Sequence, residues 1–246
     1  YITWREHKKI FKKLYKNQIL LVRAPPGTGK TVIIPKLFAH FFGYQKPIIC
    51  TTPRQKTTFS AADWASQLLD VNLITKDEST NEQIDSGLRY VGYKYKDANM
   101  YDETTKILFS TDGSIKVMMT SQDPDLKEYA GIIIDEAHER NINIDILIAL
   151  VIELCKRRPD FKVIIMSATI DSVVVKDYIK RLNMLDRYDI YSPEGVPPNF
   201  RLDKEFASTK NIKVNDVINI IEKKIDSLLK NNTIMDKLFS PDNNID

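Results

Sequence analysis

The feature that most constrains the fold of this chain is a glycine-rich loop at residues 24–31, with the sequence Ala-Pro-Pro-Gly-Thr-Gly-Lys-Thr. It follows an apolar run at 19–22 and precedes an amphipathic stretch at 31–42, the strand–loop–helix order of phosphate-binding loops. Glycines let backbone N–H groups turn toward phosphate oxygens, and a helix start adds the positive end of its dipole. The residues expected to hold nucleotide phosphates are Pro26, Gly27, Thr28, Gly29, Lys30 and Thr31.

The rest of the chain alternates between apolar runs and amphipathic stretches. Runs of Ile, Val and Leu without polar alternation are typical of strands that are buried on both faces of a parallel sheet. Stretches with helical spacing lie between them, so the chain is predicted to form an α/β, doubly wound, mainly parallel sheet with helices on both faces. The strands are expected at 19–22, 47–50, 88–95, 106–110, 131–134, 163–166 and 188–191, and the clearest helices at 4–16, 31–42, 57–69 and 142–156.

Composition excludes several classes of protein. The chain is 43% hydrophobic and 28% charged with a net charge of +3, which is an ordinary globular balance. Cys50 and Cys155 lie far apart in apolar runs without a CxxC or histidine partner, so we expect reduced core cysteines and no zinc site. No apolar stretch is long enough to cross a membrane and no signal peptide is recognisable, which predicts an intracellular protein without a membrane partner.

A second motif ends the apolar strand at 131–134 with two carboxylates, Asp135 and Glu136. Alone, such a pair is usually a solvated strand end, but together with Lys30 it predicts a site for a metal-bound nucleotide. Lys30 is expected to reach the β- and γ-phosphates, while Thr31 and Asp135 hold Mg²⁺. Glu136 is expected to orient and deprotonate the attacking water.

Two further segments follow these strands. His138 lies close to the expected γ-phosphate, so we favour a relay role over a structural one and include it among the catalytic residues Glu136, Lys30, Asp135 and His138. Ser167, Ala168 and Thr169 follow the run at 163–166. They either cap the next helix or bond the acidic turn and couple it to the nucleotide state, and the sequence leaves both interpretations open.

Taken together, these motifs resemble those of the DEAH group of superfamily 2 RNA helicases. The tetrad Asp135-Glu136-Ala137-His138 is the name motif of the group, and Glu139-Arg140 continues it as in the family. The resemblance covers roughly residues 1–200. The other matching segments are 50–54, 91–93, 111–113, 123–124 and 167–169.

The resemblance implies a RecA-like motor domain at 1–185, with a leading helix at 1–17, that uses ATP and Mg²⁺. It also implies an RNA backbone track over residues at the ends of two strands. Arg54 is suited to donate hydrogen bonds to a phosphate, and a helix start at 111–113 offers hydroxyl and N–H groups as further donors. Without the resemblance, 51–54 could instead be an ordinary loop. The expected RNA contacts are Pro53, Arg54, Thr111, Asp112 and Gly113.

The chain departs from the family pattern at three positions. Ala24 replaces a usual glycine, and Gln55 stands where a second arginine is common, which weakens one expected phosphate contact. Trp64 occupies the place of an arginine that stacks on adenine in the family. Its indole either stacks on the base in the same way or is a core residue of its helix, and the sequence favours neither.

The largest departure concerns a second RecA-like domain, which supplies arginine fingers in such helicases. No Gln-Arg-Gly-Arg-like motif occurs in 170–246. We therefore expect 186–246 to be an exit linker, with a turn at 192–198 and a helix at 214–229 that begins the second domain. The leading prediction is the first motor domain of an ATP-dependent RNA helicase. The alternatives are a translocase acting on DNA or on both nucleic acids, and a nucleotide-gated binding module without catalysis.

Overall fold

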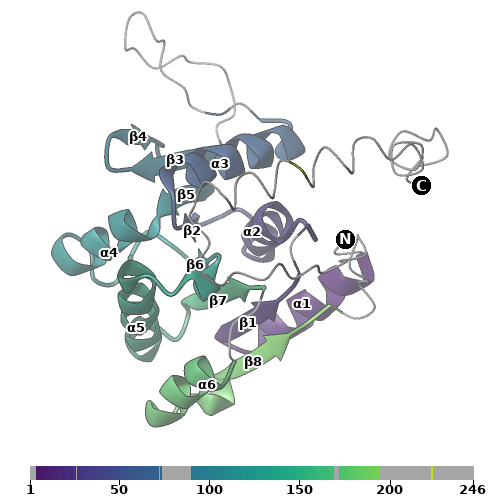
Figure 1. Ribbon diagram of the computed structural model, residues 1–246, viewed down its shortest axis with the longest axis vertical. Coiled ribbons are helices and arrows are strands. Elements are labelled where there is room, and N and C mark those ends of the chain that lie inside the picture. Colours follow the sequence, from purple (N-terminus) through teal and green to yellow (C-terminus); the bar gives the residue numbers. More distant parts are fainter. Residues whose placement is uncertain are drawn as a thin grey trace, which may run out of the picture. The chain divides into compact units, whose positions relative to one another are not determined.

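The computed structural model describes residues 4–25, 27–71, 73, 90–168, 172–193 and 223 (Figure 1). The chain forms two compact units, Tyr1–Asn199 and Phe200–Asp246. All described residues except Lys223 belong to the first unit, which carries every candidate site residue. Pro26, Thr169, the expected turn at 192–198 from residue 194 onward, and the expected helix at 214–229 except Lys223 lie outside the described residues.

The first unit is built on one eight-stranded sheet with the strand order β4-β3-β5-β2-β6-β7-β1-β8. All neighbouring strands are parallel except β4, which forms an antiparallel hairpin with β3. The strands are β1 (Ile19–Arg23), β2 (Ile48–Thr52), β3 (Val91–Tyr95), β4 (Ala98–Met100), β5 (Ile107–Thr111), β6 (Gly131–Ile134), β7 (Lys162–Ser167) and β8 (Tyr188–Tyr191).

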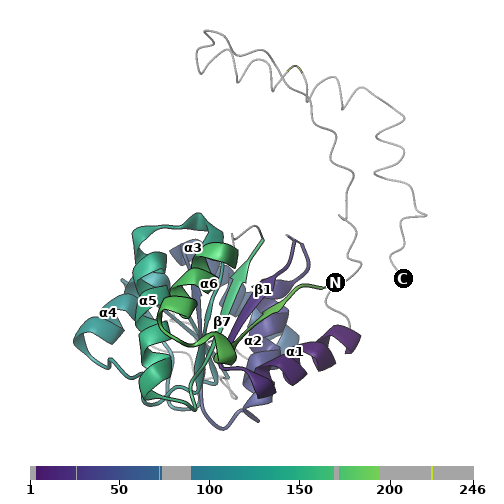
Figure 2. The same cartoon turned by 90° about the horizontal axis from the view of Figure 1, so that it is seen from below.

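Helices cover both faces of the sheet (Figures 1 and 2). The chain moves along the sheet in one direction through α2 and α3 and in the other through α4, α5 and α6, so right-handed crossovers put the two sets on opposite faces. The first face also carries α1. The helices are α1 (Trp4–Lys16), α2 (Lys30–Phe41), α3 (Gln55–Leu69), α4 (Asp112–Ser121), α5 (Ile142–Arg157) and α6 (Ser172–Arg181), with short 3-10 turns at Ala137–Glu139 and Leu185–Arg187.

Two apolar cores lie between these layers, one on each face. Ile10, Phe38 and Phe109 belong to the first core, and Leu147 and Phe161 belong to the second. The helices pack closely enough that side-chain size matters. A Cβ on Gly131 would lie 2.5 Å from both the Lys162 carbonyl oxygen and Phe38 Cζ, so only glycine lets α2 approach β6. The predicted doubly wound α/β class is confirmed.

The expected strands and helices agree with the structure to within a few residues wherever it describes them. The sequence did not predict β4 or the extents of α4 and α6. Strand β8 pairs with β1 through Ile19↔Tyr188 to Val22↔Tyr191, and the first unit runs to Asn199. The last strand of this sheet therefore lies beyond residue 185, inside the segment expected to be an exit linker.

Cys50 and Cys155 are buried free cysteines, as predicted. Burial raises the pKa of the Cys155 thiol to about 12, which keeps it protonated and unreactive. Within the described part of the chain, no helix combines the length and the apolar character needed to span a bilayer.

The parallel strands all end at the same edge of the sheet, and this edge carries the predicted motifs. The glycine-rich loop follows β1, Asp135 follows β6, and Arg54 lies just after β2. In open α/β sheets, ligands bind outside these carboxyl ends. The strand order places β1, β7 and β6 together and puts β2 and β5 next to them.

Candidate nucleotide site and nucleic-acid interface

The loop after β1 has the backbone that a phosphate cradle needs. Gly27 and Gly29 have φ values of 77° and 73°, in the left-handed region where glycine is favoured. The Thr28 hydroxyl donates a 2.9 Å hydrogen bond to the Pro25 carbonyl oxygen, which closes the loop on itself. Helix α2 begins at Lys30, so its unpaired N–H groups and positive dipole end face the loop.

Two contacts join this loop to the end of β6. Lys30 Nζ lies 3.2 Å from Glu136 Oε1, and the Thr31 hydroxyl donates a 2.6 Å hydrogen bond to Asp135 Oδ2. Residues that are 104 or more positions apart in the sequence thus meet at this edge of the sheet. Lys30 is only 5% exposed, so its ammonium group is held in place before any ligand arrives.

The Thr31–Asp135 pair has the chemistry of a magnesium site. Two hard oxygen donors converge on one point, and Mg²⁺ is usually held by one or two protein oxygens together with phosphates and water. Among the described residues, no group of three or more His, Cys, Asp or Glu side chains is arranged to hold a metal by itself. The two oxygens are thus compatible with a magnesium ion that is also bound by phosphate and water.

Asp135 is fully buried, and its environment is finely balanced. Burial raises the pKa of this carboxyl to about 6, and the hydrogen bond from Thr31 opposes that rise. Asp135 Oδ1 also accepts a 2.8 Å hydrogen bond from the Glu136 N–H. A cation at this point would favour the ionised form of the carboxylate.

The chain turns sharply after Asp135. Glu136 has φ 51° and Arg140 has φ 48°, and these left-handed residues bracket the 3-10 turn Ala137–Glu139. His138 Nδ1 lies 3.3 Å from Glu136 Oε2, so the Glu136 carboxylate sits between an imidazole and the Lys30 ammonium group. This arrangement is compatible with the predicted relay role of His138.

Ser167, from the segment at 167–169, lies beside the glycine-rich loop. Strand β7 is the neighbour of both β1 and β6, and the Ala24 N–H donates a 3.1 Å hydrogen bond to the Ser167 carbonyl oxygen. Ser167 is fully buried and Ala168 is partly buried. Strand β7, which ends at Ser167, thus lies between the strand before the glycine-rich loop and the acidic strand, and the coupling role of Ser167 stays a prediction. The helix that it precedes, α6, begins at Ser172.

Trp64 is 61% exposed on α3, so the interpretation of this residue as part of the core is wrong. Helix α3 packs beside α2, and Lys36 Nζ on α2 donates a 3.3 Å hydrogen bond to the carbonyl oxygen of Leu68, one turn after Trp64. The exposed indole thus lies on α3, next to α2, which is the helix that follows the glycine-rich loop. Stacking on a base stays a prediction.

The second half of the edge, at β2 and β5, carries exposed cations and hydroxyls. The Arg54 side chain is 71% exposed, and its Nη2 lies 3.1 Å from Glu139 Oε1. Pro53, Thr111 and Gly113 are partly exposed, as nucleic-acid contacts must be. Asp112 differs: it is 2% exposed, so its carboxylate is buried below this surface. Its place among the RNA contacts stays a prediction.

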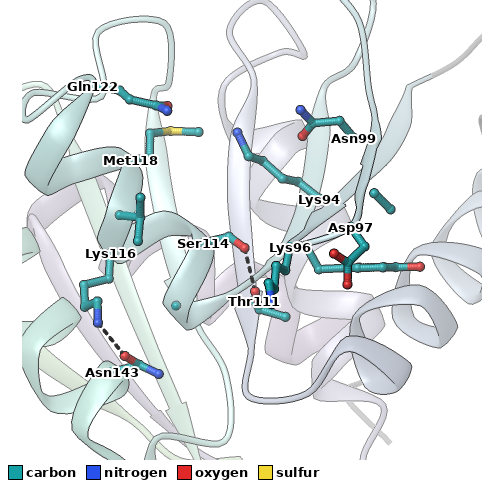
Figure 3. A pocket seen from close by; sticks show the side chains of 14 residues that line it. Lys94, Lys96, Asp97, Asn99, Thr111, Ser114, Lys116, Met118, Gln122 and Asn143 are labelled. Atoms are coloured by element: carbon teal, nitrogen blue, oxygen red, sulfur yellow. Dashed lines mark hydrogen bonds between the residues drawn. The ribbon is translucent and has the colours of Figure 1, made fainter.

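A groove of about 790 Å³ extends this exposed region between the β3–β4 hairpin and α4 (Figure 3). Lys94, Lys96 and Lys116 line it together with one carboxylate, Asp97. Its wall includes Thr111, whose hydroxyl lies 2.8 Å from the Ser114 hydroxyl. The cationic surface beside β5 is therefore broader than the sequence motifs indicated.

Residues 4–177 of the chain match the family model described as DEAD/DEAH box helicase. This chain belongs to the DEAD/DEAH box helicase family. The match covers most of the first compact unit, and the mostly parallel sheet with helices on both faces is the RecA-like fold of these helicase domains. The family prediction made from the motifs is confirmed.

Three relatives extend the match. A protein of Acanthamoeba polyphaga mimivirus that is named as an ATP-dependent RNA helicase is 38% identical over 190 residues, which are 76% of this chain and 25% of that protein. The ATP-dependent RNA helicase HrpA of Borreliella burgdorferi is 31% identical over 222 residues, 88% of this chain and 24% of HrpA. The DExH-box ATP-dependent RNA helicase DExH8 of Arabidopsis thaliana is 27% identical over 183 residues, 74% of this chain and 16% of DExH8. This helicase domain spans about a quarter or less of the length of these relatives.

Inside the helicase domain, Asp112 is 2% exposed at the start of α4. Neither of its carboxylate oxygens has a well-aligned hydrogen-bond partner among the described residues, although the buried Thr51 hydroxyl is close enough to lower the pKa of this carboxyl. Burial outweighs that effect and raises the pKa of Asp112 to about 6, and the charges of Glu139 and Asp135 add to the rise. A buried carboxylate without a good hydrogen bond lowers the stability of the fold.

Sequence reasoning missed three parts of this site: the Arg54–Glu139 pair, the lysines of the hairpin and the burial of Asp112. The lysines at 94 and 96 flank a strand turn, and their alternation with tyrosine was a usable signal. The other two depend on the pairing of β2 with β6 and of β2 with β5, which no local pattern reveals.

Proposed function

We propose that this domain is the first motor domain of an ATP-dependent RNA helicase, which binds Mg·ATP over β1 and β6 and the RNA backbone over β2 and β5. The observation that carries the proposal is the convergence of Lys30 and Thr31 on Glu136 and Asp135. A phosphate loop facing an acidic strand end is what phosphoryl transfer to water requires, because little covalent chemistry is left for the protein to do.

In this proposal Lys30 and the N–H groups of residues 27–31 hold the phosphates, and Thr31 with Asp135 holds Mg²⁺. The metal would neutralise charge that develops on the phosphate oxygens. Glu136 orients the attacking water and accepts its proton, with His138 positioning the carboxylate from 3.3 Å away. The buried Ser167 lies between the two strands and relays the state of the site.

RNA is proposed to cross Pro53, Arg54, Thr111 and Gly113 and to continue along the groove lined by Lys94, Lys96 and Lys116. Apart from Pro53, which has no N–H to donate, these groups offer hydrogen bonds or positive charge to phosphates, and contacts to the backbone carry no sequence information. Binding should therefore be insensitive to sequence. The names of the relatives favour RNA over DNA as the polymer.

Hydrolysis is proposed to need a second RecA-like domain that donates arginines to the γ-phosphate. An arginine supplied in trans contributes roughly 10³–10⁵ to the rate of related enzymes. Residues 170–246 contain no Gln-Arg-Gly-Arg-like motif, and the chain spans a quarter of its first two relatives. The domain alone should therefore bind ATP and hydrolyse it slowly.

The test is ATP turnover by the complete gene product with RNA, with DNA and with no polymer. RNA should stimulate turnover. Glu136→Gln should reduce turnover at least about 100-fold, since general base catalysis contributes roughly 10²–10⁴, while nucleotide affinity stays within about threefold. Equal stimulation by DNA would support the dual-specificity alternative. Turnover that is unchanged in Glu136→Gln would overturn the catalytic role and support a nucleotide-gated binding module.

A further inference from the structure

The ion pair between Arg54 and Glu139 connects the two halves of the sheet edge. Arg54 lies just beyond β2 and Glu139 lies five residues beyond β6, and β2 and β6 are neighbours in the sheet. Arg54 Nη2 and Glu139 Oε1 are 3.1 Å apart, with 71% and 30% of the two side chains exposed. The pair therefore lies where RNA is proposed to pass. Its Glu139 partner belongs to the turn after β6, the strand that also leads to the proposed nucleotide site.

An RNA phosphate can compete for this arginine. A guanidinium group binds phosphate through two parallel hydrogen bonds, whereas the described contact with Glu139 uses one nitrogen. Exposed ion pairs contribute little free energy of their own, so exchange of one anion for another is easy. Glu139 thus binds the same guanidinium group that an incoming RNA phosphate would bind.

Release of Glu139 has a defined consequence beneath the surface. Asp112 is buried, and the charge of Glu139 is near enough to raise the pKa of Asp112. While Arg54 pairs with Glu139, its positive charge offsets the repulsion between these two carboxylates. When a phosphate binds Arg54, Glu139 loses this cation, and repulsion from Asp112 favours movement of Glu139 away from it.

The turn that carries Glu139 also carries Glu136. The Glu139 N–H donates a 2.9 Å hydrogen bond to the Glu136 carbonyl oxygen, and the buried Ala137 fixes the turn against the core. The left-handed φ of 51° at Glu136 and 48° at Arg140 leaves the turn few ways to adjust. A displacement of Glu139 is therefore passed to Glu136, whose carboxylate lies 3.2 Å from Lys30 Nζ.

From these contacts we infer that Glu139 is a positioning residue: it holds Arg54 until an RNA phosphate displaces it, and its release readjusts Glu136 at the nucleotide. The inference rests on the proposed function, because it requires RNA at Arg54 and a nucleotide at Lys30. In this inference, the effect of RNA binding on nucleotide binding depends on one ion pair, Arg54–Glu139, that can be exchanged for a phosphate contact.

The test measures equilibrium affinities of the full chain for a labelled oligouridylate and for Mg²⁺ with a non-hydrolysable ATP analogue, each with and without the other ligand. In the wild type, RNA should change the affinity for the analogue by about fivefold or more, with the same factor in the reverse direction. The variants are Glu139→Gln, which removes the charge, and Glu139→Asp, which shortens the side chain and breaks the pair. Glu153→Gln is the matched control, because Glu153 forms an exposed ion pair with Lys156 on α5.

Both Glu139 variants should bind RNA about threefold more tightly, while Arg54→Gln should bind it about tenfold more weakly. In all three the coupling factor should fall toward one, and the affinity for the analogue without RNA should already match that of the RNA-bound wild type. Glu153→Gln should behave like the wild type.

The inference is overturned if both Glu139 variants leave RNA affinity and the coupling factor unchanged. It is also overturned if they weaken RNA binding as Arg54→Gln does, because Glu139 would then orient Arg54 for RNA and not compete with it. A wild type that binds no RNA would instead overturn the proposed function, and the inference with it.

Discussion

The two halves of the sheet edge handle phosphate in opposite ways. On the nucleotide side the functional groups are buried and already paired: Lys30 is 5% exposed, Asp135 is fully buried, and both have partners. On the proposed RNA side the cations are exposed, with 71% of the Arg54 side chain open to solvent. Buried and preorganised contacts give strong and specific binding, whereas exposed ones are weak and screened by salt.

The difference fits what a motor domain must do with each ligand. A nucleotide has to be held in one geometry while a bond is broken, so its site gains from being fixed in advance. A polymer backbone has to be gripped and released repeatedly, so contacts that exchange easily serve better. The segment after β6 belongs to both halves, because Asp135 contacts Thr31 of the glycine-rich loop and Glu139 contacts Arg54.

The largest expected effect tests the buried side. Lys30→Met should weaken Mg·ATP binding at least about 30-fold, because loss of one partner of a buried charge pair costs roughly 2–5 kcal/mol. RNA affinity measured without nucleotide should stay within about twofold. Nucleotide binding by fluorescence titration checks this, with Lys94→Met in the groove as the control lysine. Equal losses in the two variants would mean that the two sides are not separate.

The next effect concerns Asp112, which is buried although its sequence neighbours belong to the RNA side. Its raised pKa means that the folded state favours the neutral carboxyl, so its stabilisation is full below pH about 4 and is lost as pH rises through about 6. At pH 8, Asp112→Asn should therefore raise stability by on the order of 2 kcal/mol, or about 4–8 °C in Tm.

Thermal unfolding at pH 8 and at pH 4 separates this explanation from others. The gain should disappear at pH 4, where Asp112 is already neutral. Asp186→Asn, at an exposed position, is the control that should show no gain at either pH. A lower Tm for Asp112→Asn at pH 8 would mean that the ionised carboxylate stabilises the fold.

A smaller effect is expected for the cations of the groove. The double substitution Lys94→Met with Lys96→Met should weaken RNA binding on the order of tenfold at low salt. The slope of log affinity against log salt should fall by about 1.4, because each phosphate contact on a single strand contributes about 0.7. Mg·ATP affinity should remain unchanged. An unaltered salt slope would remove these lysines from the RNA path.

The smallest effect concerns Trp64. If the exposed indole stacks on adenine, Trp64→Ala should weaken ATP binding about fivefold, toward the lower end of the ~1–3 kcal/mol of a base–aromatic stack. Affinity for inorganic triphosphate should not change, because it has no base. Tyr15→Ala, at an aromatic residue that is 83% exposed on α1, is the matched control. Equal ATP affinity in the wild type and Trp64→Ala would eliminate the stacking role.

What the sequence predicted follows from how local each signal is. The glycine-rich loop and the acidic strand end are continuous segments, and each carries its own chemistry, so both were found together with their strands. The doubly wound sheet followed from apolar runs such as 131–134, which coincides with β6. Helix α4 had a signal that went unused, since Ile115, Met118 and Met119 repeat at helical spacing and are buried.

The features that the sequence could not predict depend on strands that become neighbours only in the folded chain. The Arg54–Glu139 pair joins residues that are 85 positions apart. The burial of Asp112 was hidden because its neighbours Thr111 and Gly113 are partly exposed, so the whole segment was assigned to RNA contact. Strand β4 has three residues, which is too short for any periodicity to show.

The central claim is that one sheet edge holds two separate phosphate sites, one for a nucleotide and one for a polymer. The most direct measurement titrates labelled oligouridylate onto the chain at increasing concentrations of Mg²⁺ and a non-hydrolysable ATP analogue. The account predicts a ternary complex in which RNA affinity changes to a plateau as the nucleotide site fills. RNA affinity that keeps falling in proportion to nucleotide concentration would mean that both ligands compete for one site, and it would contradict the account.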